Sequence, residues 1–146
     1  NCIRVGAATA VVANGTQADM IMERIEDGGK PLDALAISLV AYGYERDELD
    51  TPRIAGVVRG KMGWLGIARK EEFRVRQFDL KEGSAFMVAT YEKTDFEALA
   101  LGGQSAEEIA RRAYDLPLER PVCGAAALAL TAEQRQGYDL AVYNPE

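Results

Sequence analysis

The chain has 146 residues, of which 48% are hydrophobic and 27% charged, and its formal net charge is −6. This length suits a single domain with a sizeable core, and the apolar content excludes an intrinsically disordered chain. The acidic balance argues against broad nucleic-acid binding, because neutralising phosphates requires a basic face.

The first part of the chain is typical of two short strands followed by a helix start. The strands are expected over residues 2–5 and 9–12, and Asn14-Gly15 ends the second one. Thr16, followed by Asp19 three residues later, is similar to a capping box, in which both side chains bind backbone N–H groups. A helix is therefore expected to begin directly after Thr16.

Two helices are predicted here. The first is expected over residues 17–27 and is closed by Gly28-Gly29. The second begins at Pro31, which is tolerated in a first turn, and has Asp33 near its positive end. Its apolar residues recur at the spacing of a helix that lies on a core. They are Leu32, Leu35, Ala36, Leu39 and Val40.

The remainder of the chain is richer in predicted strands. Thr51-Pro52 favours extended backbone, because proline disfavours a helical predecessor. Ser105 is expected to cap a helix through residues 107–112. Because strands precede, separate and follow the helices without regular alternation, we predict an α+β fold with antiparallel sheets in one domain. The later strands are expected over residues 54–58, 63–68, 73–78, 85–91, 124–130 and 138–143.

The stretch from Tyr42 to Arg53 is the strongest candidate for chemistry. It follows the patterned helix and precedes an apolar strand, and side chains converge on ligands at such junctions. Neighbouring like charges raise one another's pKa, which suits a carboxyl group for proton transfer. The alternative is a solvated, charged helix end without chemistry. The carboxylates are Glu45, Asp47, Glu48 and Asp50.

The inventory of side chains narrows the chemistry further. The chain has no histidine, which excludes Ser-His-Asp and Cys-His catalysis and imidazole zinc sites. The acidic stretch lacks the ligand pattern of a calcium loop, and a magnesium site is a minor alternative. Two cysteines, Cys2 and Cys123, are too few for a disulfide framework, so a reducing, cytoplasmic setting is favoured. A buried structural role is the expectation for both thiols. No run approaches 18 apolar residues, so no membrane span is expected.

Two blocks of the sequence closely resemble the archaeal-type IMP cyclohydrolases. The first is Asn1-Cys2-Ile3-Arg4, followed by Thr9-Ala10-Val11-Val12-x-Asn14-Gly15. The second is Tyr44-Glu45-x-Asp47-Glu48-Leu49-x-Thr51-Pro52-Arg53-Ile54-Ala55, and the run Thr90-Tyr91-Glu92-x-Thr94 is similar too. The resemblance covers most of the first two thirds of the chain, and the second block is long enough to be specific.

The resemblance implies an Ntn-hydrolase-like fold, a four-layer αββα sandwich of two antiparallel sheets flanked by helices. It implies an enzyme of de novo purine biosynthesis that closes the ring of 5-formamidoimidazole-4-carboxamide ribonucleotide to give IMP and water. No metal or organic cofactor is implied. The expected partner is a purine nucleotide, with no nucleic acid and no membrane, and a homo-oligomer is a further expectation. Because the family has a leading segment before the position of Asn1, the domain is expected to be N-terminally incomplete.

The resemblance also implies roles for individual side chains. Glu45 matches the family's catalytic glutamate and is expected to be the general acid/base. Tyr44 is expected to hydrogen-bond nearby, or else to pack at the helix end. Arg53 is expected to pair with the substrate phosphate or to hold Glu45, with a structural salt bridge as the alternative. Asn1 and Cys2 are expected to line the site at the start of a strand.

Alternative interpretations of the site and of the function remain. Asn14 and Thr16 flank backbone donors at a helix start, which suits an anion, whereas the alternative is a plain turn and N-cap. An Ntn-type amide hydrolase, with a self-exposed Cys, Ser or Thr nucleophile, is one alternative function. A non-catalytic purine-nucleotide-binding domain is the other.

Overall fold

The computed structural model describes residues 2–131 and 137–145. Within these residues the fold is α+β with antiparallel sheets, as the sequence predicted. The helices are α1 (Gln17–Glu26), α2 (Pro31–Tyr42) and α3 (Ala106–Tyr114). The strands are β1 (Ile3–Val5), β2 (Thr9–Ala13), β3 (Arg53–Arg59), β4 (Met62–Ala68), β5 (Phe73–Asp79), β6 (Ala85–Met87), β7 (Glu97–Leu99), β8 (Gly124–Ala129) and β9 (Tyr138–Tyr143).

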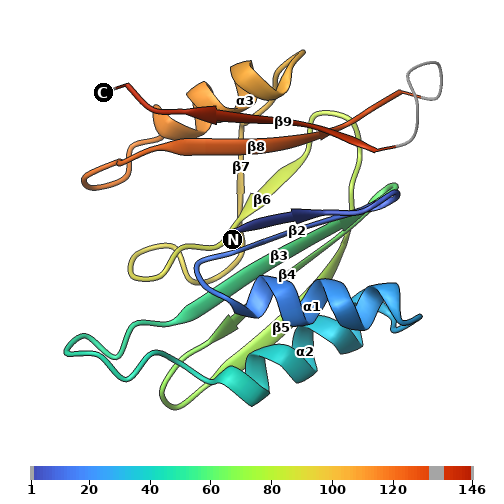
Figure 1. Cartoon of the computed structure of the whole chain (residues 1–146). Coiled ribbons are helices and arrows are strands. Elements are labelled where there is room, and N and C mark those ends of the chain that lie inside the picture. The colour runs from blue at the N-terminus through green and yellow to red at the C-terminus, as the bar shows by residue number, and fades with distance from the viewer. Residues whose placement is uncertain (1, 132–136, 146) are drawn as a thin grey trace.

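A five-stranded antiparallel sheet of order β1-β2-β3-β4-β5 forms the centre of the fold. Helices α1 and α2 cover one face of this sheet, whereas the β8–β9 pair and α3 lie on its other side (Figure 1). Strands β6 and β7 form a separate two-stranded sheet. Helices α1 and α2 connect β2 to β3. Because these two strands pair antiparallel, the end of β2 lies beside the start of β3, with Ala13 opposite Ala55.

The main core lies between α1, α2 and the central sheet. Ile21 from α1, Leu35 from α2 and Val11 from β2 are almost completely buried in it. Helix α2 approaches the sheet at Gly66, where an added Cβ would collide with Leu39. The glycine therefore permits the close contact between helix and sheet on which this half of the fold depends.

Helix α2 buries a face that overlaps the predicted stripe but is shifted away from Val40. Leu35 and Leu39 are buried as expected, but Val40 is 61% exposed and Ala36 is only partly buried. The buried positions are Pro31, Ala34, Leu35, Ser38 and Leu39. The prediction is confirmed for Leu35 and Leu39 and wrong for Val40. This helix is apolar on nearly every side, so periodicity alone does not fix the edges of the face that meets the sheet.

The two predicted helix caps have different outcomes. The Ser105 hydroxyl accepts a hydrogen bond from the Glu108 backbone N–H at 3.2 Å, which confirms the cap of α3. Thr16 stands at the N-cap of α1 but has helical dihedral angles, and its side chain makes no cap hydrogen bond. The Asp19 carboxylate instead pairs with Arg4 of β1. The predicted capping box at Thr16 is therefore wrong, because a tertiary ion pair holds the acidic side chain.

The second half of the chain follows the predicted strands with two changes. The strand expected over residues 85–91 ends at Met87, and β7 was not predicted. The predicted strand pair is present as β8 and β9, while the middle of the polar turn between them, residues 132–136, falls outside the described residues. Phe78 of β5 stacks on Phe86 of β6, which packs the β6–β7 sheet against the central sheet.

An apolar cavity of about 360 Å³ lies between the central sheet and the β8–β9 pair. Val12, Val58 and Trp64 line it from the central sheet, and Ala125 and Ala127 line it from β8. The two layers meet at one end, where the Tyr138 hydroxyl donates to the Ala8 carbonyl at 3.2 Å. None of the described helices is long and apolar enough to cross a membrane.

Candidate functional site

The loop of residues 43–52, between α2 and β3, is closed by its own hydrogen bonds. The Glu45 backbone N–H donates to the Thr51 carbonyl at 2.8 Å. One oxygen of the Asp47 carboxylate accepts from the Thr51 N–H at 2.9 Å, and the other accepts from the Thr51 hydroxyl at 2.6 Å. The loop that carries Glu45 is thus a defined structure, and Asp47 organises it.

Asp47 also corrects one expectation about the acidic stretch. The hydrogen bond from the Thr51 side chain, with those from the Thr51 and Leu49 backbones, holds the pKa of Asp47 below its ordinary value of 3.8. Crowding of like charges was expected to raise the pKa of these carboxyl groups. For Asp47 that expectation is wrong, because donors within the loop stabilise the charged form.

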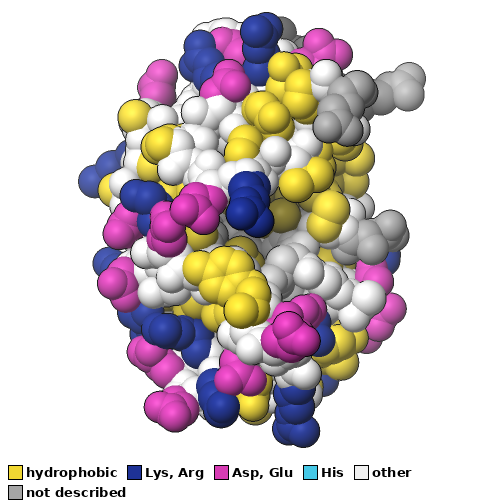
Figure 2. Space-filling model, turned by 90° about the vertical axis from the view of Figure 1, so that its left-hand side faces the viewer, with side chains coloured by type: hydrophobic (Ala, Val, Ile, Leu, Met, Phe, Trp, Pro, Cys, Tyr) yellow, Lys and Arg dark blue, Asp and Glu magenta, His cyan; other side chains and the backbone are white. Residues whose placement is uncertain are grey.

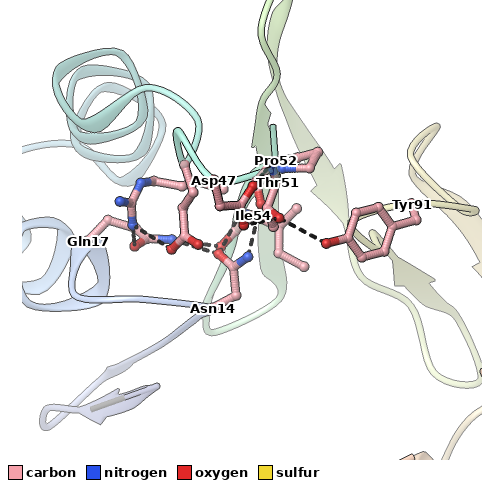
Figure 3. A network of polar contacts seen from close by, with 9 residues as sticks. Asn14, Gln17, Asp47, Thr51, Pro52, Ile54 and Tyr91 are labelled. Atoms are coloured by element: carbon pink, nitrogen blue, oxygen red, sulfur yellow. Dashed lines mark hydrogen bonds and ion pairs between the residues drawn. The ribbon is translucent and has the colours of Figure 1, made fainter. Parts of the chain in front are cut away.

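A second network joins the end of β2, the start of α1 and the start of β3. The Asn14 carboxamide accepts from the Ile54 N–H and donates to the Pro52 carbonyl, each at 3.0 Å. The Gln17 Nε2 donates to the Asn14 Oδ1 at 2.9 Å. Figure 3 shows Asn14 and Gln17 on one side of the segment from Thr51 to Ile54, and Tyr91 on the other.

Arg53 connects this network to the candidate catalytic carboxylate. Its Nη1 lies 3.3 Å from the Gln17 Oε1 and 3.3 Å from the Glu45 Oε1. Its guanidinium also stacks over the Tyr42 ring, 5.3 Å from the ring centroid. The Arg53 side chain is 19% exposed and that of Glu45 is 37% exposed. In this geometry Arg53 holds Glu45, while one side of the carboxylate stays open to solvent.

Tyr91 brings a distant part of the chain to the loop. Its hydroxyl lies 2.9 Å from the Thr51 Oγ1, and its ring is largely exposed. Reasoning from residue chemistry did not single out Tyr91, although it belongs to the run of residues 90–94 that carried part of the family resemblance. Gln17 was missed altogether, because a single polar residue in a first helical turn has no distinctive local signal.

The other residues that the sequence analysis assigned to the site are Cys2, Thr16 and Asn1. The Cys2 carbonyl accepts from the Ala13 N–H at 2.8 Å, which places Cys2 beside the end of β2 and next to Asn14. Thr16 is exposed at the start of α1. Asn1 falls outside the described residues. The expected burial of the thiols is wrong, since Cys2 and Cys123 are both free and exposed.

Tyr44 is not joined to Glu45 by a hydrogen bond in the part of the chain that the structure describes. It lies near Lys70, whose amino group donates to the Asp50 carboxylate at 2.9 Å. This hydrogen bond, the charge of Asp50 and the proximity of Tyr44 together raise the pKa of Lys70. The structure therefore links Asn14 to Glu45 through Gln17 and Arg53, and it places Tyr44 near Lys70.

A cavity of about 370 Å³ adjoins the Asn14 network. Among the described residues that line it, Asn14 alone has a polar side chain, and apolar residues such as Val12, Ile54 and Phe86 form the rest of the wall. This volume falls in the range of small-molecule sites, which are mostly apolar with a few polar groups. Glu45 does not line the cavity and is linked to it through Arg53, Gln17 and Asn14. Figure 2 shows the side of the molecule on which the loop projects, with apolar patches amid charged side chains.

The described residues contain no cluster of three or more cysteine, aspartate or glutamate side chains that is arranged to hold a metal ion. Three of the four carboxylates in the loop are instead engaged with their neighbours. Asp47 binds Thr51, Asp50 pairs with Lys70, and Glu45 pairs with Arg53.

Comparisons with known proteins agree with one another. A family model described as "IMP cyclohydrolase-like protein" matches residues 1–134. An IMP cyclohydrolase from Methanothrix thermoacetophila is 59% identical over 144 residues, which cover 99% of this chain and 70% of that protein. Proteins of the same name from Methanocella arvoryzae and Natronomonas pharaonis are 49% and 43% identical over 144 and 147 residues. The matched residues cover 99% and 100% of this chain, and 70% and 72% of those proteins.

Proposed function

The chain belongs to the IMP cyclohydrolase-like family, and we propose that it closes the six-membered ring of 5-formamidoimidazole-4-carboxamide ribonucleotide to give IMP and water. The observation that carries this proposal is the Glu45–Arg53 pair. Arg53 holds a half-exposed carboxylate and joins it, through Gln17, to Asn14 in the wall of a cavity. The relatives named above are 43–59% identical to this chain over nearly its whole length, which supports the same reaction.

The proposed reaction needs positioning and proton transfer. The carboxamide nitrogen bonds to the formyl carbon, and the formyl oxygen leaves as water with one proton from each of the two nitrogens. Because the reacting groups belong to one molecule, holding them in contact supplies much of the rate. Glu45 takes and returns protons as general acid/base. Arg53 keeps the carboxylate in place through their ion pair.

Asn14 is the proposed contact between the network and the substrate. Its Oδ1 accepts two hydrogen bonds, from Gln17 and Ile54, and its Nδ2 donates one, to Pro52. A carboxamide has two N–H groups, so one of them is left for a ligand in the cavity that Asn14 lines. Cys2 and Thr16 flank Asn14 on the neighbouring strand and helix, and with Asn1 they are proposed to complete the substrate-binding edge.

We also propose that the layers form the αββα sandwich of an Ntn-hydrolase-like fold in one domain. The order of α1 and α2, the central sheet, the β8–β9 pair and α3 supports this arrangement (Figure 1). A cytoplasmic location is proposed as well. The free, exposed thiols of Cys2 and Cys123 fit a reducing compartment.

The function is tested by following ring closure in the ultraviolet with the purified protein and the formylated ribonucleotide. IMP formation well above the rate in buffer, and dependent on Glu45, is the expected result. Binding of IMP without turnover would replace the proposal with a non-catalytic nucleotide-binding domain. Mass spectrometry of the same sample decides the amide-hydrolase alternative, since self-cleavage would leave Cys2 as the first residue.

A further inference from the structure

We propose that Gln17 is a positioning residue, which holds the guanidinium of Arg53 and through it the Glu45 carboxylate. Only the kinetic test of this inference depends on the proposed ring-closing function. Gln17 lies at the start of α1, 36 residues from Arg53 in the sequence, and no motif marks it.

The side chain of Gln17 is completely buried and engages both ends of its amide. Its Nε2 donates to the Asn14 Oδ1 at 2.9 Å and to the Ile54 carbonyl at 3.2 Å. Its Oε1 accepts from the Arg53 Nη1 at 3.3 Å. A buried polar group with both ends satisfied is held in one orientation, because any rotation would leave donors or acceptors unpaired. Gln17 is thus a rigid support for Arg53.

The contact between Gln17 and Arg53 depends on a glycine. A Cβ added to Gly15 would lie 2.6 Å from the Gln17 Oε1 and 2.9 Å from the Arg53 Nη1. Both distances are too short for a Cβ atom. The backbone at Gly15 therefore packs directly against the Gln17–Arg53 hydrogen bond and covers it on one side. Residue 15 therefore has to lack a side chain for the two groups to meet as they do.

Arg53 has few other contacts that would fix it. Its Nη1 is shared between Gln17 and Glu45, and its guanidinium rests over Tyr42. Its Nε is buried and has no hydrogen-bond partner among the described residues. Without the Gln17 Oε1, the guanidinium would be held by a half-exposed carboxylate and a ring face alone. Loss of Gln17 should therefore be transmitted to Glu45.

The chemistry of this position calls for an amide rather than a carboxylate. The Gln17 Nε2 faces two oxygens, Asn14 Oδ1 and Ile54 O, which require a donor. A glutamate at position 17 would repel both oxygens and would compete with Glu45 for the charge of Arg53. A neutral amide orients Arg53 and leaves its charge to Glu45.

The test is a double-mutant cycle between Gln17→Met and Glu45→Gln, read as kcat and KM for ring closure. Gln17→Met keeps the volume of the side chain and removes both hydrogen-bonding ends. In the parent we expect kcat to fall about 10- to 100-fold with KM nearly unchanged, as for a misplaced catalytic group. In the Glu45→Gln background the same substitution should have little further effect on kcat. Equal losses in both backgrounds would overturn the proposal.

Two further variants separate positioning from stability. Ser38→Ala changes another completely buried polar side chain, in α2, and should leave kcat unchanged. If Gln17→Met does not fold, Gly15→Ala takes its place in the cycle. Its Cβ meets side-chain rather than backbone atoms, those of Gln17 and Arg53, so it acts on the contact itself. A Gly15→Ala protein with parental kcat would contradict the proposal.

The hold on Arg53 is also measurable without turnover. In solution NMR the Arg53 guanidinium should rotate slowly in the parent and quickly in Gln17→Met. Equal rotation rates in the two proteins would show that Gln17 does not hold Arg53, whether or not the protein catalyses ring closure. A parent protein without ring-closing activity, but with a rotation difference, would refute the proposed function and leave the role of Gln17 standing.

Discussion

The Asp47 carboxylate holds Thr51 through two hydrogen bonds, one from the Thr51 N–H and one from its hydroxyl. A third hydrogen bond, from the Asp50 N–H to the Asp47 carbonyl, closes the same loop. The carbonyl of Thr51 in turn accepts from the Glu45 N–H. The backbone of Glu45 is therefore fixed by the loop, and its side chain is fixed by Arg53 of β3. The proposed catalytic carboxylate is held from two independent directions.

Glu45→Gln should remove most ring-closing activity and leave the fold intact. The amide keeps the size of the side chain but cannot take up a proton, and general acid/base groups contribute about 10²–10⁴-fold in rate. Steady-state kcat and the thermal midpoint measure the two effects. Glu48→Gln, an exposed carboxylate of the same loop, is the matched control and should retain parental kcat. If Glu45→Gln turned over substrate at the parental rate, Glu45 would not be the general acid/base.

Arg53→Lys should reduce kcat by about 10- to 100-fold although the positive charge is kept. A lysine ammonium cannot reproduce the planar contact over Tyr42 together with the hydrogen bond to Gln17. The measurement is kcat with the circular dichroism spectrum as a check of folding. Arg46→Lys, on an exposed residue of the same loop, is expected to behave like the parent. Full activity in Arg53→Lys would show that charge alone suffices.

Asp47→Asn should weaken the acid sensitivity of the folded state. The folded-state pKa of Asp47 lies below the ordinary value of 3.8, so its stabilising contribution is fully present above about pH 3.8. That contribution is lost as the pH falls through the lowered folded-state pKa. Thermal midpoints measured from pH 7 down to pH 2.5 should fall less steeply in Asp47→Asn than in the parent. Identical slopes would mean that the Asp47–Thr51 hydrogen bonds do not stabilise the charged carboxylate.

Tyr138→Phe should remove an alkaline sensitivity of the folded state. Burial raises the pKa of Tyr138 above its ordinary value of 10.0, against the opposing effect of nearby Arg59. The resulting stabilisation is present below about pH 10 and is lost as the pH rises through the folded-state pKa. Urea midpoints between pH 8 and pH 11 measure it. Tyr91→Phe, on an exposed tyrosine, serves as the control and should show the parental decline.

Gly124→Ala should destabilise the packing of α3 on β8. An added Cβ would collide with the backbone carbonyl of Ala110, which cannot move without shifting the helix. Overpacking of this kind costs about 1–3 kcal/mol. Denaturant unfolding measures the loss, and Gly102→Ala is the control, because nothing lies within 4 Å of its added Cβ. Equal unfolding midpoints for the two variants would show that α3 adjusts without cost.

Local sequence signals predicted much of this fold. Proline at the first position of α2, Ser105 before α3 and the glycines after α1 mark helix ends by backbone chemistry alone, and the structure has them where they were predicted. The strands of the central sheet follow from short β-branched and aromatic runs, whose preference for extended backbone is local. The acidic block and its neighbours also indicated the family before any geometry was known.

Tertiary contacts decided the features that the sequence did not predict. They join residues that are far apart in the chain, and such pairs leave no local sequence pattern. Which face of α2 is buried depends on the sheet beneath it, since Val40 is as apolar as Leu39. Asp19 forms an ion pair with Arg4 instead of capping its helix, and Gln17 meets Arg53 only because β2 and β3 pair. Sequence indicated most of the helices and strands, though neither the end of β6 nor β7, and it placed Glu45 in the motif. The pairing of strands determined what holds that glutamate, because a side chain's partners are set by packing rather than by its neighbours in the chain.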